Sequence, residues 1–232
     1  MKNGKNLIIV SQSLLVNLKS NLGYIHNVET LGTIPYNDLV KELDNDDRKN
    51  AFWINIYNSF MRIKIKNPKD MKTYPKFEFF SKDDIKISNL KLSLDDIEHK
   101  ILRKSKLKLF RGYVTNIFAY GWERELRVKK LDNRIHFALN CGARSCPPIS
   151  SYDDETISKQ FEVSKKNFIL NDSKFDSSTN TLSVSRIFFW YIGDFQGKKG
   201  VIEIHREIGI VPKDLDPGQI KLSFNTYNWE IL

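Results

Sequence analysis

Residues 51–62 read Ala-Phe-Trp-Ile-Asn-Ile-Tyr-Asn-Ser-Phe-Met-Arg and open the most apolar segment of the chain, which runs to residue 65. The preceding residues, Asn45-Asp46-Asp47, are of the types that cap the start of a helix. Pro68 follows, and a proline disfavours helical backbone at the residue before it, so the helix should end there. A helix this apolar is buried, so the sequence predicts a core helix.

Four polar side chains interrupt this segment at helical spacing: Asn55, Asn58, Ser59 and Arg62. Buried amides need hydrogen-bond partners. Two interpretations stay open. The stripe faces solvent or ties down a loop, or Asn55 and Asn58 bind a ligand because they line a polar cavity.

Hydrophobic periodicity and turn residues predict the other elements. Helices are expected at 7–22, from Pro35 to about 43, from 93 to about 104, at 153–170 and at 198–208; strands at 134–139 and near 220–231; hairpins at 85–92 and 174–185; and a connector at 67–84 that ends in the aromatic cluster Phe77, Phe79 and Phe80. Helices and strands do not alternate as in βαβ units, so the fold class is α+β. We expect a single domain over 1–232, with helices packed on a small, mostly antiparallel sheet.

Composition limits the kind of protein. The chain has 232 residues, a formal net charge of +9 and 41% hydrophobic residues, which suits a globular domain and excludes a disordered tail. No apolar run approaches the length of a membrane span. The first 16 residues do not resemble a signal peptide. We therefore expect a cytoplasmic protein, or an exported one if a leader has been removed.

The positive charge is concentrated in one region. Residues 60–112 hold 15 Lys and Arg against 7 Asp and Glu, whereas the rest of the chain is nearly balanced. Most of these cations are lysines, and nucleic-acid sites favour arginine. We do not expect nucleic-acid binding. The surplus favours an anionic small-molecule or peptide ligand, and a protein partner stays open.

A predicted helix carries an acidic residue on its apolar side. Ser93 and Asp96 match a capping box, and Leu94, Ile97 and Ile101 form the apolar stripe. Glu98 lies one turn from Leu94 and from Leu102 and should point toward the interior. A carboxylate against apolar surface is either held in an ion pair or tuned for proton transfer. His99, beside it, is expected at the surface or in a capping role unless it serves as a base.

The predicted strand at 134–139 leads into a loop with the only two cysteines, Cys141 and Cys146. The loop also contains Asn140, Gly142 and Arg144. Three interpretations compete. A Cys141–Cys146 disulfide is disfavoured in a cytosolic protein, and a zinc site would need two more ligands and an unusual spacing. A nucleophilic cysteine activated by a histidine is therefore favoured, and no metal or cofactor is expected.

The choice of histidine depends on the strand. If residues 134–141 are extended, His136 lies on the opposite face from Cys141 and roughly 16 Å away. His99 comes from a separate helix and has no such constraint. His136 could instead meet Cys146 if the loop folds back.

Three blocks of this sequence resemble the DUF547 family of proteins of unknown function. They are Ala51-Phe-Trp-Ile-Asn-Ile-Tyr-Asn58, Leu92-Ser-Leu-Asp-Asp-Ile-Glu-His99 with Ile101-Leu-Arg103, and residues 134–148 around Asn140-Cys-Gly. A later block, Val184–Phe195, is also similar. The resemblance implies a family core at 45–232 behind a helical part at 1–44. It also suggests a distant relation to papain-like and transglutaminase-like cysteine enzymes.

The sequence thus favours a cysteine-dependent hydrolase or acyl transferase. In this hypothesis Cys141 attacks a carbonyl, His99 or His136 takes the proton, and Glu98 orients the base. Asn55 and Asn140 would stabilise the oxyanion, Arg144 would bind an anionic group of the substrate, and Asn58 and Cys146 would complete the binding site. The alternative is a non-catalytic protein- or anion-binding module, so whether the protein is an enzyme stays open.

Overall fold

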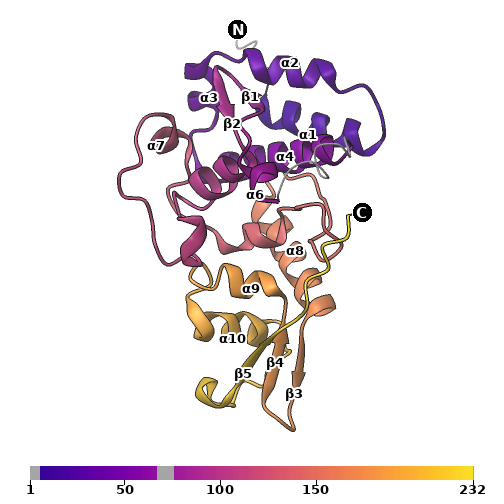
Figure 1. Ribbon diagram of the computed structural model, residues 1–232, viewed down its shortest axis with the longest axis vertical. Coiled ribbons are helices and arrows are strands. Elements are labelled where there is room, and N and C mark those ends of the chain that lie inside the picture. The colour runs from indigo at the N-terminus through magenta and orange to yellow at the C-terminus, as the bar shows by residue number, and fades with distance from the viewer. Residues whose placement is uncertain (1–5, 67–75, 232) are drawn as a thin grey trace.

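The computed structural model describes residues 6–66 and 76–231. Helices dominate the N-terminal half, and a three-stranded sheet lies at the C-terminal end (Figure 1). The longer elements are α1 (Leu7–Lys19), α2 (Ile25–Thr33), α3 (Tyr36–Glu42), α4 (Asp46–Ile65), α8 (Ile157–Asp172) and α10 (Gly197–Glu207). Shorter helices are α6 (Lys76–Ser81), α7 (Trp122–Leu126), α9 (Arg186–Trp190), the π-helix η1 (Asp96–Leu102) and the 3-10 helices η2 (Lys108–Phe110), η3 (Asn133–Phe137) and η4 (Pro217–Gln219).

Helix α4 is the predicted core helix. The side chain of Asn45 caps it by accepting a hydrogen bond of 3.0 Å from the amide of Arg48. Every residue from Ala51 to Met61 is buried. Because this part of α4 is buried on all sides, other elements must cover it, and α1, α8 and η1 pack against it. The helix ends at Ile65, before Pro68, as predicted.

The hairpin and capping box predicted at 85–96 are confirmed. Strands β1 (Ile85–Ile87) and β2 (Leu90–Leu92) pair antiparallel. The amide of Ser93 donates to Asp96 at 2.9 Å, and the amide of Asp96 donates to Oγ of Ser93 at 3.0 Å. These two reciprocal bonds fix the start of η1, the helix that presents Glu98 and His99.

The C-terminal sheet joins β3 (Lys174–Asp176), β4 (Thr181–Val184) and β5 (Lys221–Phe224). The β3–β4 hairpin is antiparallel as predicted, whereas β5 runs parallel to β4. Of the strand pair predicted near 220–231, the first strand is confirmed as β5, whereas the second does not form. After Phe224 the chain leaves the sheet and pairs with the cysteine loop, where the amide of Arg144 donates to the carbonyl of Glu230 at 2.7 Å.

The strand predicted at 134–139 is also wrong, because residues 133–137 form η3. Asp132 explains the difference: its side chain accepts from the amide of Arg134 at 2.9 Å and also binds that residue's guanidinium. A cap of this kind favours a helical turn over extended backbone. The backbone then closes tight turns, with the amide of Ala138 donating to the carbonyl of Ile135.

Two apolar clusters form the interior. One surrounds α4 and contains the side chains of α1, the β1–β2 hairpin and η1; the other surrounds β4, α9 and α10. The fold class is α+β, as predicted. The helices predicted at 7–22, after Pro35, at 153–170 and at 198–208 are confirmed within a few residues, whereas α2, α6, α7 and α9 were missed.

Residues 67–75 of the predicted connector, and the side chain of Phe77, lie outside what the structure describes, while the rings of Phe79 and Phe80 meet edge to face. Across the described ranges, no helix combines the length and apolarity needed to cross a bilayer. The division at residue 45 stays a prediction.

Candidate functional site

A cavity of about 580 Å³, which we call the site cavity, lies where η1 and α4 face α9 and the C-terminal segment. Its wall contains Glu98, His99, His136, Cys141 and Cys146. The structure thus brings together all four predicted catalytic residues and the second cysteine. Aromatic side chains from α4, α9 and the C-terminal segment form much of the rest of the wall.

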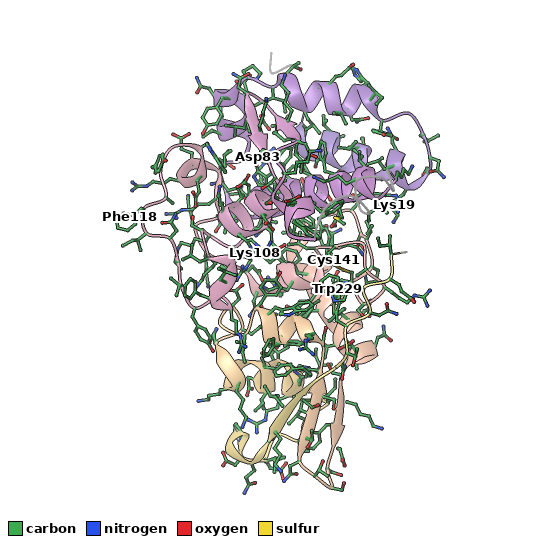
Figure 2. All side chains as sticks on the ribbon, in the orientation of Figure 1. Lys19, Asp83, Lys108, Phe118, Cys141 and Trp229 are labelled. Carbon is green, nitrogen blue, oxygen red and sulfur yellow. A yellow bond between two sulfur atoms is a disulfide. The ribbon has the colours of Figure 1, made fainter. Side chains whose placement is uncertain are left out.

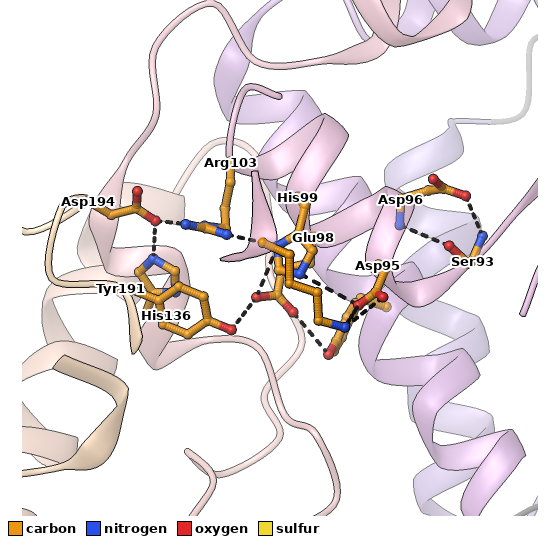
Figure 3. A network of polar contacts seen from close by, with 11 residues as sticks. Ser93, Asp95, Asp96, Glu98, His99, Arg103, His136, Tyr191 and Asp194 are labelled. Carbon is orange, nitrogen blue, oxygen red and sulfur yellow. Dashed lines mark hydrogen bonds and ion pairs between the residues drawn. The ribbon is translucent and has the colours of Figure 1, made fainter. Parts of the chain in front are cut away.

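Glu98 is buried, as predicted, and its carboxylate accepts two phenol hydrogen bonds. Tyr191 donates to it at 2.6 Å and Tyr57 at 3.4 Å. Burial by itself raises the pKa of Glu98, but the neighbouring His99 ring, the charge of Arg103 and the hydrogen bond from Tyr191 outweigh burial and lower it. Glu98 is therefore an ionised group that holds two tyrosines in place. Figure 3 shows its hydrogen bond with Tyr191.

His99 is buried, so the expected surface position is wrong. The guanidinium of Arg103 approaches Nδ1 of His99 through Nη1 at 2.9 Å. A guanidinium only donates, so Nδ1 is the acceptor and the proton of the neutral ring lies on Nε2. Nε2 is 3.5 Å from Asp95. Nδ1 lies 3.7 Å from Glu98, and since Nδ1 carries no proton, Glu98 does not orient this ring by a hydrogen bond.

The second histidine has a different partner. Nε2 of His136 lies 2.9 Å from Oδ2 of Asp194, which also accepts from Nε of Arg103 at 2.7 Å. Burial alone would raise the pKa of Asp194, but His136 and Arg103 lower it to about 2. The carboxylate is therefore ionised and can only accept, which places the proton of His136 on Nε2.

His136 consequently presents a free lone pair. No group in the described parts of the chain hydrogen-bonds its Nδ1. Burial lowers the pKa of His136 and outweighs the opposing effect of Asp194, so the ring is neutral at pH 7. Tyr191 stacks on it, with 4.0 Å between ring centroids. A neutral imidazole with one nitrogen held by an aspartate and the other free has the arrangement of a general base.

The expectation against a disulfide is wrong, because Cys141 and Cys146 are bonded to each other. The tight turn of the loop at 142–145 brings their Cα atoms within 6.2 Å, a normal separation for a disulfide. The hydroxyl of Tyr227 lies 3.1 Å from Sγ of Cys146 and 3.4 Å from Sγ of Cys141. In this oxidised state neither cysteine has a thiol, so nucleophilic chemistry requires reduction.

The side chains of the three asparagines predicted to bind a ligand form hydrogen bonds with backbone groups instead. Asn55 bonds the amide and the carbonyl of Tyr152, and Asn58 bonds the carbonyl of Ala138 and the amide of Asn140. The side chain of Asn140 bonds the carbonyl of Pro147 and the amide of the residue two positions on. None of the three lines the site cavity. Of the two interpretations of the α4 stripe, the structure supports the one in which it ties down loops.

Arg144 points away from the site cavity. It lines a second cavity of about 590 Å³, the basic cavity, on the other side of the cysteine loop. Among the described residues, three other cations line this cavity: Lys19, Arg62 and Lys66. Cys146 and Pro147 belong to both walls.

Sequence reasoning missed Asp194, Arg103, Tyr191 and Tyr227. Arg103 lies one turn after His99 on the same helical face, a spacing that could have revealed it. Asp194 follows Gly193 in a block noticed only for its family resemblance. Gly193 packs so tightly against the backbone of Gly112 that a side chain would not fit there. A glycine beside an acid is weak evidence alone, so nothing local singled out Asp194.

A comparison of the sequence with protein families assigns this chain to one of them. A model of the family described as "Protein of unknown function, DUF547" matches residues 40–169. The chain belongs to the DUF547 family. The match includes Glu98, His99, His136 and both cysteines, whereas Asp194 and the Val184–Phe195 block lie beyond it, so the resemblance of that block stays a prediction. Neither the curated proteins nor the solved structures contain a match to this DUF547 chain.

Proposed function

We propose that the site cavity is the active site of a cysteine-dependent hydrolase or acyl transferase. One observation carries the proposal: the wall that contains the sulfur of Cys141 also contains His136, a neutral imidazole whose proton is held by Asp194 and whose other nitrogen is free. A nucleophile, a base and a group that orients the base are the three parts that such chemistry needs.

The reaction begins once two thiol equivalents have reduced the disulfide. Nδ1 of His136 takes the proton of the Cys141 thiol, and the sulfur attacks the carbonyl carbon of the substrate. The tetrahedral adduct expels the leaving group, which receives the proton from His136, and a thioester remains on Cys141. Water, or an acceptor in the case of acyl transfer, then attacks the thioester while His136 takes its proton. The released Cys141 sulfur recovers that proton.

His136 suits the role of base better than His99. The lone pair of His99 on Nδ1 already accepts from Arg103, and its other nitrogen carries the proton. His136 has its lone pair unused, and its charged form would be stabilised by Asp194. Glu98 then acts on His136 through Tyr191: it accepts a hydrogen bond from the hydroxyl of Tyr191, whose ring stacks on His136. We therefore assign Glu98 and Tyr191 as positioning residues.

The test is alkylation of the reduced protein with iodoacetamide over a range of pH, with each cysteine followed by peptide mass spectrometry. Cys141 should react faster than an ordinary thiol near neutral pH. His136→Gln should remove that advantage, and Asp194→Asn should weaken it. Cys146→Ser should keep it. If Cys141 reacts only above about pH 8.5, as an unperturbed thiol does, the nucleophile assignment is wrong.

The basic cavity favours a second candidate function, the binding of a small anion such as a phosphate or carboxylate group. Lys19, Arg62 and Lys66 use neutral oxygens as partners, at 3.3, 3.3 and 3.0 Å respectively. Calorimetric titration with inorganic phosphate tests this. Lys66→Gln should weaken binding, while Lys159→Gln on α8 should not. Unchanged binding in Lys66→Gln would exclude the cavity as the site.

A further inference from the structure

The segment Leu107–Tyr120, which we call the apolar loop, exposes an unusual amount of apolar surface. It contributes eight of the sixteen large hydrophobic side chains that are exposed in the described residues. Leu109, Ile117, Phe118 and Tyr120 are 86%, 81%, 79% and 84% exposed. Phe118 lies at the outer edge of the molecule in Figure 2. Apolar side chains gathered in this way mark a surface that binds something.

Backbone hydrogen bonds hold the apolar loop in a defined shape. The amide of Leu107 donates to the carbonyl of Val114 at 2.9 Å, and the amide of Asn116 donates to the carbonyl of Ser105 at 2.7 Å. The amide of Gly193 donates to the carbonyl of Arg111 at 2.8 Å and ties the loop to the turn after α9. The exposed side chains therefore project from a fixed frame.

The charges around the loop have one sign. From Lys100 to Gly121 the sequence contains no Asp or Glu. Lys104, Lys106 and Arg111 have no carboxylate within ion-pair distance among the described residues, whereas Lys108 pairs with Asp95 at 2.7 Å. Basic side chains without acidic partners, next to exposed aliphatic and aromatic ones, complement a surface that is anionic outside and apolar beneath.

We propose that the apolar loop binds the surface of a membrane that contains anionic lipids. Its aliphatic and aromatic side chains enter the boundary between headgroups and acyl chains, and Lys104, Lys106 and Arg111 contact lipid phosphates. A protein partner fits less well, because lysine is depleted from protein interfaces and a projecting loop offers no broad face. The inference does not depend on the proposed chemistry.

The position of the loop has a consequence for the site cavity. Lys108, Leu109 and Arg111 belong both to the apolar loop and to the wall of that cavity. A protein bound through the loop therefore holds this wall of the cavity near the lipid surface.

The experiment is cosedimentation of the full chain with vesicles of phosphatidylcholine, with and without phosphatidylserine. Binding should require phosphatidylserine. Phe118→Ser should reduce the partition coefficient about tenfold or more, since a buried phenylalanine side chain is lost from the lipid. Lys104→Gln and Lys106→Gln should each reduce it about fivefold. Val163→Ser and Lys159→Gln, exposed positions on α8, are the matched controls and should bind as the unmodified chain does.

Circular dichroism of each variant separates lost binding from lost folding. The proposal is overturned if vesicles are not bound, or if the loop variants bind as tightly as the α8 controls. Light scattering measures whether the chain forms a dimer in solution. A dimer that Phe118→Ser dissociates, without any vesicle binding, would make the loop an interface between copies of this chain instead.

Discussion

The backbone amide of Cys141 donates to Sγ of Cys146 at 3.0 Å, so one cysteine stabilises the sulfur of the other. The hydroxyl of Tyr227 lies closer to the same sulfur than to Sγ of Cys141. Hydrogen bonds of this kind stabilise a thiolate. When the disulfide opens, Cys146 is therefore the better leaving group, and an attacking thiol should bond to Cys141.

The first prediction concerns which sulfur glutathione attacks when it partially reduces the Cys141–Cys146 disulfide. The glutathione thiolate should attack Sγ of Cys141 and form a mixed disulfide there, while Cys146 leaves as a thiolate and is alkylated by the quenching reagent. Peptide mass spectrometry assigns the two adducts. Tyr227→Phe should slow the opening several-fold, because one of the two donors is lost. Glutathione found mainly on Cys146 would contradict the assignment.

The second prediction concerns the buried Arg103–Asp194 pair, whose side chains are both inaccessible to solvent. Asp194→Asn leaves the guanidinium buried without its counter-ion and should lower the free energy of unfolding by about 3–5 kcal/mol. Urea denaturation measures the loss. The double variant Arg103→Met with Asp194→Asn removes both charges and should recover part of it. A double variant less stable than Asp194→Asn alone would show that charge burial is not the cause.

The third prediction concerns His205, which is buried between the carbonyl of Val201 and the hydroxyl of Ser173. Burial lowers its pKa to about 4. In the unfolded chain His205 therefore becomes protonated near pH 6.5, whereas in the folded chain it becomes protonated only near pH 4. The stabilisation is complete above pH 6.5 and is lost as the pH falls toward 4, by about 3 kcal/mol in all.

Urea denaturation at pH 7.5 and at pH 5 measures this effect. His205→Gln should reduce the difference in unfolding free energy between the two pH values. Ser173→Ala is the matched control, since it removes a hydrogen bond to the ring but keeps the imidazole. An unchanged pH dependence in His205→Gln would assign the acid sensitivity to other groups.

The sequence could predict the parts of the site that depend on local pattern. The apolar stripe of η1 places Glu98 inside, and the capping box at Ser93 places the start of that helix. The backbone conformation around His136 was predicted wrongly, because an alternating apolar pattern indicates a strand. The hydrogen bonds of the Asp132 side chain favour a 3-10 turn instead. Asp194 meets its partners only through tertiary packing, across 58 residues of sequence from His136, and no local pattern records such a distance.

The prediction that His99 lies at the surface was wrong for a related reason. Its helical face is polar in sequence, which indicates solvent. In the structure Arg103 continues that face and forms a buried ion pair with Asp194, so this face packs inside the protein. The disulfide was disfavoured by an argument about cellular compartment. The compartment does not determine how close two cysteines lie, whereas the turn at 142–145 brings the Cα atoms of Cys141 and Cys146 within 6.2 Å.

The last prediction uses two asparagines of α4 that anchor different loops. Asn58 bonds the carbonyl of Ala138 and the amide of Asn140 and so holds the start of the cysteine loop, whereas Asn55 bonds the backbone of Tyr152. Asn58→Ala leaves both of its backbone groups without this partner. Asn55→Ala leaves the amide of Tyr152 unpaired, whereas the carbonyl of Tyr152 keeps the side chain of Gln12 as a donor at 3.0 Å. Each substitution should therefore lower the free energy of unfolding by about 2–4 kcal/mol in urea denaturation.

Their effects on the disulfide should differ. Asn58→Ala loosens the backbone beside Cys141 and should speed reduction by dithiothreitol several-fold, because local opening exposes the sulfurs. Asn55→Ala, which is also destabilising but acts on a different loop, should leave the reduction rate near that of the unmodified chain. Equal acceleration in both variants would mean that the disulfide is reduced after global unfolding. Asn58 would then not stabilise the cysteine loop, at the wall of the site cavity, more than Asn55 does.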